Sequence, residues 1–263
     1  MKNFNVLLLK EYKNTKIEIL ESQNLKGVTN PQMAMDMFFA NQSGLKSRLI
    51  KITLNNSKIK TEAGALYFYK GKIKSDSSIG GTKGFLKKMV SGALTSESLV
   101  KPTYEGIGEV YLEPSFNHFY IMNLENEEII VDKGLFYCCT DGIDVTPFNP
   151  TNISSAVLGG EGIFQIRLKG TGLVVLEVGV PQDEILEMKI NKGEELKVDG
   201  NFAIIRTSGV DFSVTTSDKS LLNSALNKEG FLNTFRGEGS VWLAPTLKIY
   251  EQLGVNNTVN NIN

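Results

Sequence analysis

Three acidic residues, each just before a glycine, are the strongest candidates for metal chemistry in this 263-residue chain. They lie in Glu62-Ala-Gly64, Asp132-Lys-Gly134 and Asp199-Gly200. Three carboxylates that converged on a pseudo-threefold axis would suit a hard cation such as Ca²⁺ or Mg²⁺. Alternatively, each acid orders its own turn by accepting hydrogen bonds from nearby backbone N–H groups. We favour the local turn, and we expect no resident metal or cofactor.

The chain has a single histidine, His118, which precedes the apolar stretch Phe119-Tyr-Ile-Met122. Metalloenzymes built on double-stranded β-helices need several imidazole ligands, and one histidine cannot supply them. No serine lies in a Gly-x-Ser-x-Gly motif, and no second imidazole base is available for a nucleophile. We therefore expect no enzymatic activity. His118 is predicted as a strand-end residue, the alternative being a pH-sensitive or ligand-contacting role.

The two cysteines, Cys138 and Cys139, are adjacent. Neighbouring residues in a strand point to opposite faces, so a disulfide between them would be strained. The sequence predicts two reduced thiols in a strand, with a vicinal redox pair as the alternative.

A glycine pair starts the pattern Gly-x-Gly-x-Val-x-Leu three times, with first glycines 64 and 67 residues apart (170 − 106 and 237 − 170). The copies lack the third glycine of a dinucleotide-binding loop and the Lys-Ser/Thr ending of a Walker motif. We therefore interpret them as structural glycines that supply positive φ or a bulge at tight corners. They are Gly106, Gly108, Gly170, Gly172, Gly237 and Gly239.

The segments around these glycines also recur, which indicates three related β units of about 65 residues. Residues 54–62, 124–132 and 190–199 are each predicted to form a hairpin, because polar turn residues separate apolar runs. Nearly continuous apolar strands follow each of them. Gly142 and Gly209 open the next strand, whereas the first unit has Gly71 offset by one residue, which predicts a register change or bulge.

These patterns predict one repeat-built β domain over residues 1–255, with units at roughly 30–100, 101–167 and 168–250. Short helices are expected in the connectors near 85–94 and 220–228, and the Asn-rich residues 256–263 are expected to form a frayed tail. Lys83, Lys87 and Lys88 in the first connector would give weak contact with an anionic membrane surface. We favour packing within the protein for this segment.

Charge and hydropathy exclude other classes. The 28 basic and 29 acidic residues nearly cancel, so nucleic acid is not expected as a partner. The apolar run Val6-Leu-Leu-Leu9 is too short for a signal sequence or a membrane span, which predicts a cytoplasmic protein.

Three segments resemble the altered-inheritance-of-mitochondria protein 24 family: Gly160-Glu-Gly-Ile-Phe164, Gly193–Asp199 and Gly230–Leu243. The resemblance covers roughly residues 30–250 and is most specific over 159–243. It implies an all-β fold, a double-stranded β-helix or β-roll of the kind grouped with the tryptophan RNA-binding attenuation protein (TRAP-like). It also implies a homo-oligomer such as a trimer, and it brings no catalytic motif.

The leading functional hypothesis is a non-enzymatic, oligomeric β scaffold that mediates protein assembly. The alternative is a small-ligand or RNA-binding regulator, by analogy with the tryptophan RNA-binding attenuation protein. Analogy of fold is a weak basis for function.

Overall fold

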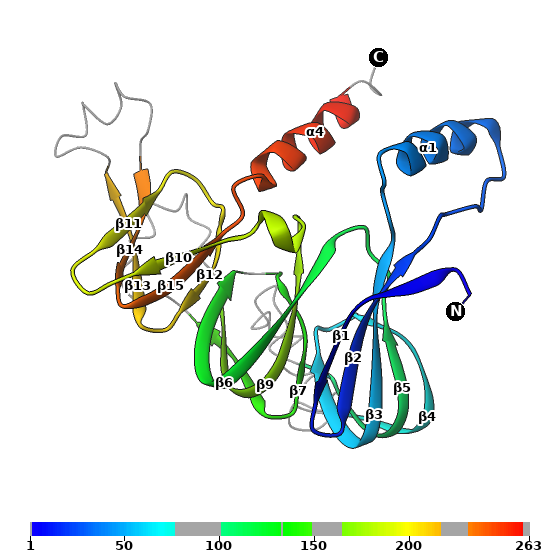
Figure 1. Cartoon of the computed structure of the whole chain (residues 1–263), viewed down its shortest axis with the longest axis horizontal. Coiled ribbons are helices and arrows are strands. Elements are labelled where there is room, and N and C mark those ends of the chain that lie inside the picture. The colour runs from blue at the N-terminus through cyan, green and yellow to red at the C-terminus, as the bar shows by residue number, and fades with distance from the viewer. Residues whose placement is uncertain (1, 77–100, 133, 149–164, 217–230, 260–263) are drawn as a thin grey trace, which may run out of the picture. The chain divides into compact units, whose positions relative to one another are not determined.

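The computed structural model describes residues 2–76, 101–132, 134–148, 165–216 and 231–259, which are mostly β-structure in antiparallel sheets (Figure 1). The chain divides into two compact units. Unit 1 comprises residues 1–125, 136–143 and 170–178, and unit 2 comprises the rest. The long strands β6 (His118–Asp132) and β9 (Gln165–Val178) contribute residues to both units.

Unit 1 has a core formed by alternating residues of neighbouring strands. Ile17, Ile19, Ile50 and Ile52 are at most 1% exposed, because every second residue of a strand points to the same face. Besides parts of β6 and β9, the elements of unit 1 are β1 (Phe4–Tyr12), β2 (Thr15–Ser22), α1 (Pro31–Gln42), β3 (Arg48–Thr61), β4 (Leu66–Asp76), β5 (Thr103–Leu112) and β7 (Phe136–Thr140). β2 pairs with β1 and β3, and β5 pairs with β3 and β4.

Unit 2 has its own apolar core, in which the Phe212 and Phe235 rings lie 5.2 Å apart. Besides parts of β6 and β9, the elements of this unit are β8 (Ile143–Phe148), the 3-10 helix η1 (Gln182–Glu184), β10 (Leu186–Ile190), β11 (Glu195–Val198), β12 (Ala203–Thr207), β13 (Val210–Thr216), β14 (Phe231–Gly237), β15 (Gly239–Leu243) and α4 (Leu247–Val259). Strand β15 pairs with β10 and β12, while β14 pairs with β11 and β13 in a three-stranded sheet.

Three sets of strands show the same pairing order, and we call them ladders one, two and three. Ladder one is β3, β4 and β5; ladder two is β6, β7–β8 and β9; ladder three is β10–β11, β12–β13 and β14–β15. In each ladder the last strand lies between the other two. The same register break also recurs between the second and last strands, at Tyr67, Tyr137 and Ile204.

The predicted hairpins at 54–62, 124–132 and 190–199 are wrong, because the chain does not reverse there. β3 and β6 run straight through, and Asn56 and Asn126 have φ values of 54° and 60°. A residue with positive φ adds a bulge to a strand that otherwise continues. In ladder three, β10 and β11 pair antiparallel with β15 and β14 in turn, so the chain keeps its direction across residues 191–194.

The chain reverses instead at the acid-glycine segments. The Ala65 N–H donates to the Glu62 carbonyl, and the Leu135 N–H donates to the Asp132 carbonyl, both at 3.3 Å. The glycines of the three turns, Gly64, Gly134 and Gly200, have φ values of 84°, 82° and 100°. The acids therefore mark the turns between the first and second strands of each ladder.

The six repeated glycines lie inside strand pairs rather than at corners, and all have φ between 124° and 155°. A Cβ added at any of them would lie 2.0–2.2 Å from an oxygen of the neighbouring strand. The carbonyls facing Gly106, Gly170 and Gly237 belong to Lys72, Gly142 and Gly209. Position 72 is therefore the counterpart of 142 and 209, which accounts for the one-residue offset of Gly71.

The two described α-helices do not lie in the predicted connectors. Residues 85–94 and 220–228 fall outside the described part of the chain. The described helices are instead α1, between β2 and β3, and α4, which includes residues 256–259 of the expected frayed tail. Over the described ranges, neither helix combines the length and apolar character that crossing a bilayer requires.

We expect Gly170→Ala to lower the free energy of unfolding by about 2–5 kcal/mol, since it combines overpacking with a strained φ. The added Cβ would lie 2.1 Å from the Gly142 carbonyl oxygen. Gly64→Ala is the matched control: its φ is 84° but nothing lies within 4 Å of the added Cβ, so it should cost about 1–2 kcal/mol. Urea unfolding measures both, and equal costs would contradict the close-approach explanation.

Candidate functional site

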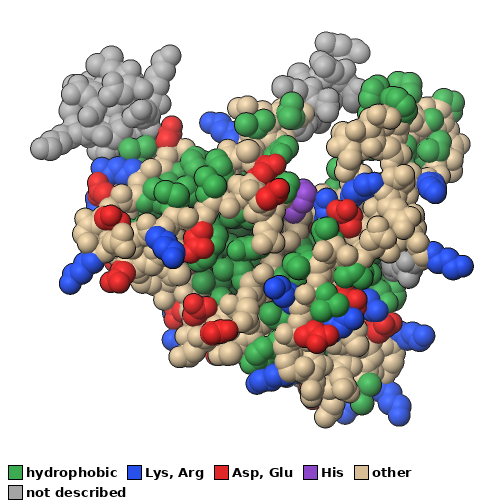
Figure 2. Space-filling model, in the orientation of Figure 1, with side chains coloured by type: hydrophobic (Ala, Val, Ile, Leu, Met, Phe, Trp, Pro, Cys, Tyr) green, Lys and Arg blue, Asp and Glu red, His purple; other side chains and the backbone are tan. Residues whose placement is uncertain are grey.

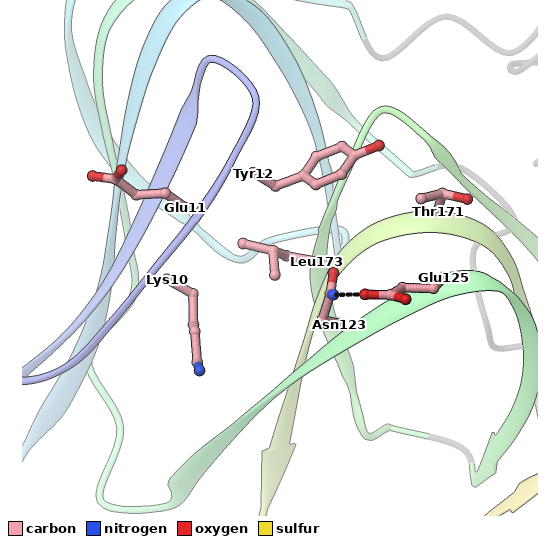
Figure 3. Close-up of a pocket in the computed structure, with 7 residues that line it drawn as sticks. All are labelled: Lys10, Glu11, Tyr12, Asn123, Glu125, Thr171 and Leu173. Carbon is pink, nitrogen blue, oxygen red and sulfur yellow. Dashed lines mark hydrogen bonds between the residues drawn. The ribbon is translucent and has the colours of Figure 1, made fainter.

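An open pocket of about 550 Å³ in unit 1 is the candidate site for a small ligand (Figure 3). It is lined from three strands, and sequence analysis did not identify it. The lining residues are Lys10, Glu11 and Tyr12 from β1, Asn123 and Glu125 from β6, and Thr171 and Leu173 from β9.

Close backbone packing positions the aromatic wall of this pocket. A Cβ on Gly172 would lie 3.5 Å from Tyr12 Cε1 and only 2.2 Å from Thr140 Oγ1. Thr140 Oγ1 in turn accepts a 3.0 Å hydrogen bond from the Leu173 N–H. The second glycine pair therefore fixes β9 beneath Tyr12.

The polar wall offers both donors and acceptors. Asn123 Nδ2 donates to Glu125 Oε1 at 3.1 Å, as Figure 3 shows. Lys10 contributes an ammonium group, and Lys13 Nζ lies 5.1 Å from the centre of the Tyr12 ring. An aromatic face beside amide, carboxylate and hydroxyl groups suits a small polar molecule with a flat apolar side.

The three repeated acids do not share a site in the described structure. No group of three His, Cys, Asp or Glu residues suited to a metal forms among the described residues. Glu62 accepts from the Ala63 N–H at 3.0 Å and pairs with Lys101, while Asp132 accepts from Gln165 Nε2 at 2.9 Å. Asp199 is exposed. The shared feature is the backbone turn, and the side chains have different partners.

His118 is the first residue of β6, at the strand end where the sequence placed it. Cys138 and Cys139 lie in β7 as buried thiols that form no disulfide. Burial raises the pKa of Cys138 well above its usual value, and a protonated thiol is a poor nucleophile.

A buried polar cluster in unit 2 was missed by sequence analysis. Arg206 is 4% exposed, and its Nη2 donates to Gln165 Oε1 at 3.1 Å, while Gln165 donates to Asp132. The Arg206 guanidinium also lies 5.2 Å from the Phe148 ring centre. Burial lowers the pKa of Arg206 to about 10 and raises that of Asp132. The available signal was an arginine at the end of the apolar run Phe202-Ala-Ile-Ile-Arg206.

The sequence comparison decides the family. Residues 40–246 match the family model described as Mitochondrial biogenesis AIM24. The chain belongs to the AIM24 family. This confirms the resemblance carried by the glycine-rich segments. None of the curated proteins is significantly similar to the chain in sequence.

A solved structure supports the fold of this AIM24 family member. The X-ray crystal structure of protein SPYM3_0169 from Streptococcus pyogenes is similar, with a TM-score of 0.54 and 19% sequence identity. The alignment covers 77% of this chain and 94% of that one. At this identity the likeness shows the fold alone.

We expect both thiols to be protected in the native protein. A thiol-specific disulfide reagent at pH 8 should react with native protein at least about 100-fold more slowly than with protein unfolded in guanidinium, because burial keeps Cys138 protonated and inaccessible. Absorbance of the thiolate released from the reagent measures the rate. Rapid modification of one native cysteine would instead favour the vicinal redox interpretation.

Asp132 should make stability depend on pH. Its pKa is raised in the folded protein above the value of about 3.9 expected in an unfolded chain, so the folded state binds more protons between these two values. Stability from this group therefore falls as pH rises through that window. Asp132→Asn keeps the acceptor for Gln165 but cannot ionise.

The urea midpoints of wild type and Asp132→Asn at pH 3.5 and pH 7 test this. The variant should gain stability relative to wild type on going to pH 7. Asp199→Asn, at the exposed acid of the corresponding turn, is the matched control. A constant difference between wild type and Asp132→Asn at both pH values would contradict the assignment.

Proposed function

We propose that this AIM24 family member is a non-enzymatic, oligomeric β scaffold that mediates protein assembly. The observation that carries the proposal is α1, a 12-residue helix with no buried residue. Met33, Met35, Phe38 and Phe39 on it are 37%, 55%, 59% and 65% exposed. Figure 2 shows hydrophobic side chains on the surface in the region of this helix.

An isolated helix of this length is marginal in water, and helices in proteins are stabilised mainly by packing. The side-chain hydrogen bonds given for α1 are local: Asn30 Oδ1 accepts from the Met33 N–H, and Gln32 Nε2 donates to Asp36 Oδ1 at 3.1 Å. A cluster of exposed Met and Phe is typical of a protein interaction surface. We infer that α1 packs against protein in the assembled state.

The proposal includes the architecture implied by the family resemblance. The three ladders are repeats of one β unit in a TRAP-like β-roll or double-stranded β-helix, and the assembly is a homo-oligomer such as a trimer. The support is the shared strand order, the register break that recurs in all three ladders, and the glycine-oxygen contacts of the same length. Self-association also covers exposed strand edges.

Size-exclusion chromatography with light scattering tests the scaffold. Wild type should be oligomeric at about 10 μM. The double change Phe38→Ser and Phe39→Ser should lower the affinity of self-association, or of binding to partner proteins, at least about tenfold, as expected when interface aromatic residues are lost. Gln42→Ser, at an exposed polar position of the same helix, is the control. A monomeric wild type that binds no protein would contradict the proposal.

The pocket favours a second candidate function, binding of a small polar ligand. Its donors and acceptors beside Tyr12 suit a sugar or nucleoside. Saturation-transfer NMR with monosaccharides and nucleosides should show contact with wild type and loss of contact in Tyr12→Ala. Absence of transfer from every compound at millimolar concentration would end this candidate. RNA binding has less support, because Lys70 and Lys74 on β4 lie opposite Glu109 and Glu105 on β5.

A further inference from the structure

Each ladder is joined to the next by the same strand contact. The end of β3 pairs with β7 through Ile59–Thr140, Lys60–Cys139 and Thr61–Cys138. The end of β6 pairs with β12 through Ile129–Thr207, Ile130–Arg206 and Val131–Ile205. The first strand of one ladder therefore receives the second strand of the following ladder, in the same antiparallel register both times.

In ladders one and three, one strand each lacks this contact. Among the described strands, β4 pairs only with β5, and β11 pairs only with β14. Counting along the shared registers, Phe68, Tyr69 and Lys70 of β4 correspond to residues 138–140 and 205–207. Leu196, Lys197 and Val198 of β11 correspond to residues 59–61 and 129–131. Ladder one thus has a second strand, β4, without this contact, and ladder three has a first strand, β11, without it.

Side-chain exposure supports this correspondence. Tyr67, Phe68 and Tyr69 are 53%, 40% and 44% exposed. The residues at the corresponding positions of ladders two and three are buried, at 8% exposure or less. They are Tyr137, Cys138, Cys139, Ile204, Ile205 and Arg206. The first ladder therefore carries large aromatic residues where the other two ladders are covered by the strand of the preceding ladder.

We propose that the missing strand is supplied by a second copy of this chain, through antiparallel pairing of β4 of one copy with β11 of another. The register of the internal contacts places Lys70 opposite Leu196, Tyr69 opposite Lys197 and Phe68 opposite Val198. This surface deepens the assembly role proposed above and rests on it. The contact is head-to-tail, so it continues from copy to copy until the assembly closes on itself or grows as a fibre.

The proposed register brings one pair of opposite charges together across the two strands. β4 presents Lys70, Lys72 and Lys74, all exposed, while acidic residues lie in and beside β11. Extending the proposed register places Glu194 opposite Lys72. Within its own copy Lys72 lies opposite Ile107 across β5, so this contact adds an acid across the strand. Opposite charges across neighbouring strands stabilise the pairing and fix its register.

Crosslinking between two single-cysteine variants tests the register directly. Lys197→Cys and Tyr69→Cys are prepared separately, mixed in equal amounts and oxidised mildly. Residues directly opposite in an antiparallel pair lie close enough for a disulfide. The mixture should form disulfide-linked dimers on a non-reducing gel, and each variant alone should form none, because a head-to-tail contact does not bring identical positions together.

The native thiols Cys138 and Cys139 are buried, so wild type is the negative control and should form no disulfide-linked dimer under the same oxidation. The register control is a mixture of Lys197→Cys with Lys74→Cys, which is five residues farther along β4 and should not crosslink. Urea unfolding of each variant checks that it is folded. Light scattering on wild type reports the assembly state independently.

The outcomes separate the interface from the broader proposal. Dimers from the 69–197 mixture with few or none from the 74–197 control support the edge contact. An oligomeric wild type without a 69–197 crosslink overturns the contact but leaves the scaffold intact. A wild type that stays monomeric at about 100 μM, a concentration at which a weak specific contact would still be populated, overturns the contact and self-assembly together. Equal crosslinking in both mixtures also overturns the assigned register.

Discussion

The architecture depends on the close approach of two backbones at the repeated glycines. An oxygen of the neighbouring strand lies 2.0–2.2 Å from where a side chain would begin, so glycine is required at these six positions. In ladders two and three the approaching group includes a threonine hydroxyl: Thr140 and Thr207 accept hydrogen bonds from the N–H groups of Leu173 and Ser240, both at 3.0 Å. The same contact places β9 beneath the pocket, so fold and candidate site share one constraint.

This constraint explains what the sequence could predict. A position with no room for a Cβ must be glycine, so the glycine pairs and the offset at Gly71 could be recognised from the sequence alone. The hairpins were mispredicted because Asn at positive φ serves both tight turns and bulges, and the residue types are the same. The pocket left no local pattern, because Tyr12, Asn123 and Thr171 come from strands that are distant in sequence.

The repeated acids show how a recurring position can lack a recurring site. The turns require a backbone carbonyl and a glycine with positive φ, and the side chain of the acid is not part of that requirement. Glu62 is therefore free to pair with Lys101, Asp132 to join the buried arginine cluster, and Asp199 to face solvent. Recurrence in sequence identified the turn correctly and carried no information about a shared ligand.

Building a protein by adding ladders side by side leaves an unfilled strand contact at each end, and exposed edges favour indiscriminate pairing. Exposed lysines on an edge strand oppose such pairing, and β4 has three of them beside its exposed aromatic residues. Lysines alone would protect the edge, and aromatic residues alone would leave it open to any strand. Their combination admits a partner that offers a backbone edge with an acidic residue in the matching register. The edge of β11 offers the backbone of Leu196–Val198 with Glu194 beside it.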